Sequence, residues 1–105
     1  MNIVDSSSQT GGIKRLILDV LKPHKPSIIE LSLKLNEVQG VVGISCILNE
    51  VDQETENIKV ILEGNDIDFE DVEKTIEDCG AVIHSVDGVS AGKRIVEDVE
   101  TPQDR

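Results

Sequence analysis

The densest positive charge in the chain lies in residues 20–27, VLKPHKPS, where Lys22, His24 and Lys25 surround two prolines. These groups could bind a phosphate or a carboxylate at the start of a helix, whose first N–H groups are unpaired. Asp19, just upstream in an apolar run, could join this site or pair with a basic residue of another copy. The competing interpretation is a rigid strand-to-helix corner without a ligand, which is the commoner role of such residues. The sequence contains no glycine-rich phosphate loop.

Acidic residues crowd the stretch NDIDFED, residues 65–71. Asp66, Asp68 and Asp71 could supply oxygen ligands to calcium or magnesium, although the glycine and the terminal glutamate of an EF-hand are missing. The same residues could simply cap a helix and complement its dipole, which is the favoured interpretation. A divalent cation shared between copies would reduce the repulsion in an oligomer of acidic chains.

Catalysis by a nucleophile finds little support in the sequence. Cys46 and Cys79 each lie in an apolar pattern, so both are expected to pack in the core. The chain has two histidines and two cysteines without CxxC or HxxxH spacing, which disfavours structural zinc. A small acid–base enzyme remains an alternative, and its groups would be His24 or His84 with Asp19 or Asp66.

Composition excludes several classes of protein. The chain has 105 residues, 21 of them acidic and 10 basic, for a net charge of -11. Such a charge disfavours binding to nucleic acids and to anionic membranes. Phe69 is its one aromatic residue, so the core must be aliphatic and base stacking is disfavoured. Neither a signal peptide nor an apolar run of about 18 residues is evident, so we expect a cytoplasmic protein with reduced cysteines.

Hydrophobic periodicity predicts six elements. Residues 14–22 alternate as a strand with Leu16, Leu18 and Val20 on one face. Ser27 and Glu30 form a capping box that opens a helix ending at Gly40. The remaining elements are a strand over 41–51 with Val42, Ile44, Cys46 and Leu48 in phase, a loop over 52–57, a strand over 58–63, a helix from Asp68 to Gly80, and a strand over 81–86.

The order of these elements is βαββαβ. It predicts an α+β, ferredoxin-like fold in which two helices pack on one face of a four-stranded antiparallel sheet. Each helix is expected to have about twelve residues. We expect this single domain to span residues 13–95, between a flexible Ser/Gly-rich tail at 1–12 and a flexible polar tail with a late proline at 96–105.

Apolar residues remain on the faces that should be polar. Ile17, Ile47 and Ile61 stand out of phase in three strands, and either Ile83 or His84 joins them in the last strand. Ile29 and Leu33 form a second apolar line on the first helix. Aligned apolar residues usually mark a contact, so we expect the open sheet face or this helix to meet another copy. Scattered surface apolar residues are the alternative.

Three motifs, LDVLKPH, EGNDIDF and IHS with AGKR, resemble the archaeal domain-of-unknown-function family 211 over residues 12–95. The resemblance implies a ferredoxin-like fold, a cytosolic archaeal origin and homo-oligomers, including closed rings, but no established activity. Cys46 and Cys79 fall where the resemblance requires no cysteine. The positions that it marks are Asp19, Lys22, Pro23, His24, Pro26, Glu63, Gly64, Asn65, Asp66, His84, Gly92 and Lys93.

Taken together, these patterns favour a non-catalytic, homo-oligomeric module that binds a ligand or a divalent cation, calcium or magnesium, in a binding or regulatory role. The small acid–base enzyme and a structural scaffold without a ligand are the alternatives. Fold alone does not choose among them.

Overall fold

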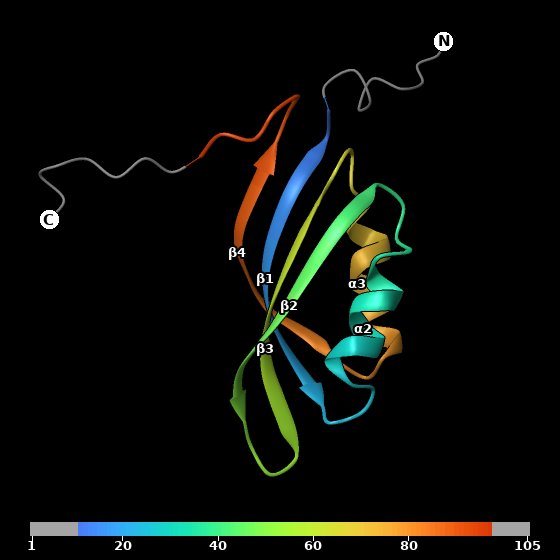
Figure 1. Ribbon diagram of the computed structural model, residues 1–105, viewed down its shortest axis with the longest axis vertical. Coiled ribbons are helices and arrows are strands. Elements are labelled where there is room, and N and C mark those ends of the chain that lie inside the picture. The colour runs from blue at the N-terminus through green and yellow to red at the C-terminus, as the bar shows by residue number, and fades with distance from the viewer. Residues whose placement is uncertain (1–10, 98–105) are drawn as a thin grey trace, which may run out of the picture.

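Six elements follow one another in the predicted βαββαβ order in the computed structural model, which describes residues 11–97. They are β1 (Ile13–Pro23), α2 (Ile28–Leu35), β2 (Val41–Val51), β3 (Thr55–Gly64), α3 (Phe69–Asp78) and β4 (Val82–Ala91). All neighbouring strands are antiparallel in the order β2-β3-β1-β4, and both helices lie on one side of the sheet (Figure 1). The α+β, ferredoxin-like arrangement is therefore confirmed. The expected tails lie mostly outside the described residues.

Side chains at the helix starts explain where the two helices begin. Ser27 Oγ accepts from the Glu30 N–H at 3.1 Å, and Glu30 Oε1 accepts from the Ser27 N–H at 3.0 Å, which completes the predicted capping box of α2. Asp68 caps α3 by accepting from the Asp71 N–H at 3.1 Å. Both caps satisfy N–H groups that the first turn of a helix leaves without an internal partner.

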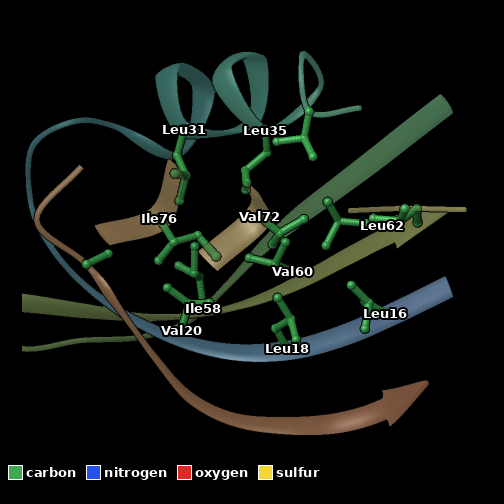
Figure 2. Packing of buried hydrophobic residues seen from close by; sticks show 13 residues of the cluster. Leu16, Leu18, Val20, Leu31, Leu35, Ile58, Val60, Leu62, Val72 and Ile76 are labelled. Atoms are coloured by element: carbon green, nitrogen blue, oxygen red, sulfur yellow. The ribbon is translucent and has the colours of Figure 1, made fainter. Parts of the chain in front are cut away.

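The core is aliphatic and lies between the sheet and the helices (Figure 2). The alternation predicted for β1 and β3 is confirmed, because the side chains of both strands that face the helices are buried. The helices contribute one buried stripe each. The residues at the centre of this core are Leu16, Leu18 and Val20 of β1, Ile58, Val60 and Leu62 of β3, Leu31 and Leu35 of α2, and Val72 and Ile76 of α3.

The phase predicted for β2 is wrong at both of its ends. Val42 is 74% exposed, because the register against β3 shifts between Val41 and Gly43. Leu48 is also exposed, and the β2–β3 hairpin extends past both helices (Figure 1). Ile44 and Cys46 do pack against the core as predicted. A bulge adds one residue to a strand, so alternation read from the sequence fails there.

Other boundaries differ from those predicted. Helices α2 and α3 have 8 and 10 residues, fewer than expected. Strand β3 begins at Thr55, so half of the loop expected over 52–57 is strand, and the Asp52 N–H donates to the Thr55 carbonyl at 2.8 Å. Strand β4 continues to Ala91. Ile83 packs against the core, so it does not join Ile17, Ile47 and Ile61, which was one of the two phases left open for this strand.

Candidate functional site

Lys22 extends the buried face of β1 by one step beyond Val20. Its side chain is 1% exposed, and it lies opposite Glu56 of β3 in the strand register. Lys22 Nζ donates to Glu56 Oε1 at 2.8 Å, to the Pro23 carbonyl at 2.8 Å and to the His24 carbonyl at 3.4 Å. An ammonium group removed from water must make such bonds to be tolerated, and here three acceptors surround it.

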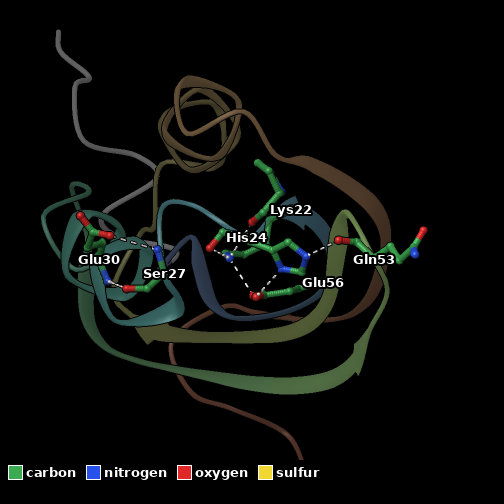
Figure 3. Close-up of polar contacts among 7 residues, drawn as sticks. Lys22, His24, Ser27, Glu30, Gln53 and Glu56 are labelled. Carbon is green, nitrogen blue, oxygen red and sulfur yellow. Dashed lines mark hydrogen bonds and ion pairs between the residues drawn. The ribbon is translucent and has the colours of Figure 1, made fainter.

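His24 completes this site from the corner that follows β1. Its Nδ1 lies 3.0 Å from Glu56 Oε2, and its Nε2 lies 2.9 Å from the Gln53 carbonyl oxygen (Figure 3). Both partners are acceptors, so the imidazolium form, in which both ring nitrogens donate, makes both hydrogen bonds and is favoured by this site. We call these three side chains the Lys22–Glu56–His24 cluster. It ties the corner between β1 and α2 to the turn of the β2–β3 hairpin.

The hydrogen bonds of the cluster shift the pKa values of His24 and Glu56. The hydrogen bond to Glu56, and then the bond to the Gln53 carbonyl, raise the pKa of His24 above its ordinary value. The hydrogen bonds from Lys22 and then from His24 lower the pKa of the Glu56 carboxyl. One carboxylate thus faces two cations, and the remaining donors of both cations go to backbone carbonyls.

Two of the predicted ligand-binding residues therefore meet around a carboxylate that the sequence interpretation missed. Lys25 is exposed beside them, and its peptide bond to Pro26 is cis. The sequence interpretation missed Glu56 because it assigned residues 52–57 to a loop. The available signal was its position two residues before Ile58, which puts a carboxylate in the buried phase of β3, as Lys22 is in β1. The arrangement supports a corner held by an ion pair more than an anion site.

Asp19 does not belong to this cluster. It lies on the opposite face of β1 and accepts a hydrogen bond from Asn57 Nδ2 at 2.6 Å. Its cross-strand neighbours are Lys59 and Ser85. Asp19 is therefore bonded to an amide of its own chain on the open face of the sheet, and it cannot act together with His24.

The predicted cation ligands lie at the start of α3. Asp68 is engaged as the helix cap, and Asp66 has a positive φ of 50° in the turn before it. Within residues 11–97, no group of three or more His, Cys, Asp or Glu side chains is arranged to hold a metal ion. A cation bound by Asp66, Asp68 or Asp71 would need further ligands, such as those of a second copy.

Comparisons with known proteins identify the family of this chain. The sequence profile of DUF211, a family described as uncharacterised ArCR, matches residues 14–105. The chain belongs to the DUF211 family. It is also 50% identical over 94 residues to an uncharacterised protein of the archaeon Methanocaldococcus jannaschii, across 90% of this chain and 97% of that protein. The resemblance seen in the motifs is thereby confirmed.

The two cysteines of this DUF211 chain are unpaired and half-buried. Burial raises the pKa of the Cys46 thiol to about 11, so it stays protonated at neutral pH. Both residues pack against the hydrophobic core. This environment suits a structural cysteine rather than a nucleophile.

The residues expected at an interface differ in exposure. Ile29 and Leu33 of α2 and Ile47 of β2 are exposed. Ile17 and Ile61 are partly buried and lie opposite each other on β1 and β3. Among the described residues of this DUF211 chain, no helix is long and apolar enough to span a membrane.

The stability of the DUF211 chain is expected to depend on the proton of His24. Because the pKa of His24 is raised above 6.5 in the folded chain, its stabilising effect is complete below about pH 6.5 and is lost as the pH rises through the folded-state pKa. Urea unfolding between about pH 6 and pH 9 measures this loss. His24→Gln should remove the His24 part of the dependence; identical pH profiles for the two proteins would contradict the assignment.

Proposed function

We propose that this chain is a non-catalytic, homo-oligomeric module of the cytoplasm, in a binding or regulatory role, whose assembly binds a divalent cation between acidic copies. The observation that carries this proposal is the exposed apolar surface. Eleven large apolar side chains are exposed within residues 11–97, and they are not among the residues that form the buried core. Seven of them lie along the two edge strands β2 and β4, and apolar side chains that gather on one part of a small protein usually mark a contact with another protein.

The surroundings of His24, Asp19 and Cys46 support a non-catalytic role. Both ring nitrogens of His24 already contact acceptors of its own chain, the Glu56 carboxylate and the Gln53 carbonyl, so neither is directed at a substrate. Asp19 lies on the other face of the sheet, and the Cys46 thiol is protonated. The unpaired cysteines also support a reducing compartment.

The charge of the chain supports the cation. A net charge of -11 opposes the approach of two copies, and a divalent cation held between carboxylates would offset part of this repulsion. Oxygen ligands such as those of Asp66, Asp68 and Asp71 suit calcium or magnesium. A small anion at the Lys22–Glu56–His24 cluster is the weaker candidate, because both basic side chains already pair with Glu56 and with backbone carbonyls of their own chain.

Native mass spectrometry of the untagged chain tests both parts of the proposal. We expect an oligomer that partly dissociates after treatment with EDTA and re-forms when calcium or magnesium is added. Sodium chloride at equal ionic strength is the control, since it screens charge without bridging carboxylates. A monomer under all conditions would contradict the proposal. An oligomer unaffected by EDTA would support self-assembly but contradict the bound cation. This result is the one expected of a structural scaffold.

A further inference from the structure

The two outer strands of the sheet carry most of the exposed apolar surface. Strands β2 and β4 are the edges of the order β2-β3-β1-β4. Seven of the eleven exposed large apolar residues within 11–97 lie on them, namely Val42, Ile47, Leu48, Val51, Val82, Val86 and Val89. Ile17 and Ile61, at the centre of the open face, are partly buried. The apolar surface is thus concentrated at the edges of the sheet.

These edges have few of the features that prevent pairing with another strand. They are 11 and 10 residues long, and neither contains a lysine or a proline. Sheets commonly blunt exposed edges with such residues, or with short or bulged strands. Both strands do contain register shifts, β4 at His84 and Asp87 and β2 at Val42 and Asn49, but β4 is regular over 88–90 and β2 over 43–48. Each edge therefore offers a stretch that can form backbone hydrogen bonds.

The directions of the two edges are complementary. Because β2 is antiparallel to β3, β3 to β1 and β1 to β4, strands β2 and β4 run in opposite directions within one sheet. When a second copy continues the sheet with its helices on the same side, its β2 lies antiparallel to β4 of the first copy. Antiparallel pairing of these two edges therefore requires no reversal of strand direction in either copy.

The charges at the ends of these strands also match. Lys93 and Arg94 are exposed directly after β4. In the antiparallel arrangement they approach the start of β2 in the next copy. There the Asp68 N–H donates to the Gln39 carbonyl at 3.1 Å, which places the acidic residues 66–71 beside that start. Opposite charges thus meet at one end of the contact in a chain whose net charge is strongly negative.

We propose that β4 of one copy pairs antiparallel with β2 of the next copy, so that neighbouring copies share one continuous sheet. This inference rests on the proposed homo-oligomer and names its contact surface. One repeated contact of this kind covers the valines of β4 and the apolar residues of β2. A two-fold contact between two β2 strands would leave Val82, Val86 and Val89 uncovered. The contact is head-to-tail, and each copy uses a different edge for each neighbour.

Two edge variants test the pairing. Val86→Lys with Val89→Lys blocks β4, and Val42→Lys with Leu48→Lys blocks β2, all at exposed positions. Native mass spectrometry is expected to find each variant no larger than a monomer. An equimolar mixture should form a heterodimer, because one variant keeps an intact β2 and the other an intact β4. Leu33→Lys, the same type of change on exposed α2, should assemble as the wild type does.

A charge-reversal variant tests the same contact without altering the sheet. Lys93→Glu with Arg94→Glu should weaken self-association by about ten-fold or more, measured by analytical ultracentrifugation at low salt. Circular dichroism checks that every variant is folded. A monomeric wild type would overturn the proposed oligomer and the edge contact together. An assembled wild type with edge variants that assemble equally well, or a mixture without a heterodimer, would overturn the edge contact alone.

Discussion

Replacing Lys22 by alanine is expected to lower the free energy of unfolding by about 3–5 kcal/mol. The ammonium group is buried and donates to Glu56 Oε1 and to the carbonyl oxygens of Pro23 and His24. Its loss leaves these acceptors without their donor and removes the packing of four methylene groups. Chemical denaturation of the wild type and the variant at neutral pH measures the difference.

Lys74→Ala is the matched control. Lys74 lies on the exposed side of α3, and within residues 11–97 its ion pair is with Asp78, at 3.1 Å, so its loss should change stability by no more than about 0.5 kcal/mol. Replacing the buried pair by Lys22→Met with Glu56→Leu should recover much of the stability lost in Lys22→Ala, because apolar residues of similar volume need no partner. Equal effects of Lys22→Ala and Lys74→Ala would contradict the structural role given to the cluster.

Leu31→Ala is expected to lower the free energy of unfolding by about 2–5 kcal/mol, whereas Leu33→Ala should change it by less than about 0.5 kcal/mol. The two leucines are on the same helix, and the change is chemically identical. Leu31 is 0% exposed beneath the helix, and Leu33 is 63% exposed on its outer side. Urea unfolding of dilute protein measures both values. Similar losses for the two variants would show that α2 does not pack as described.

The same pair of variants bears on the interface. If α2 were the contact surface, as Ile29 and Leu33 suggested from the sequence, Leu33→Ala would reduce assembly without reducing the stability of the monomer. The edge-to-edge arrangement predicts that assembly is retained. The Leu33→Ala variant therefore tests both assembly and folding, the first by its oligomeric state and the second by urea unfolding.

Much of the fold could be predicted from local patterns. The capping box at Ser27, the cap at Asp68 and the alternation in β1 and β3 involve residues close together in the chain, and all four were predicted. The bulge that exposes Val42 and the length of β4 were not predicted. Both depend on pairing with a distant strand, which periodicity within one segment does not report.

The sequence by itself determined the order of the elements, the aliphatic core and the family to which the chain belongs, because these follow from residue types at short spacing. Only the tertiary structure decided the roles of Asp19, Lys22 and Glu56. It paired Lys22 with Glu56 across 34 positions of the chain and placed Asp19 on the opposite face. It also showed that most of the exposed apolar side chains lie on the edge strands β2 and β4 and not at the centre of the open face. Whether a side chain is covered depends on which elements pack above it.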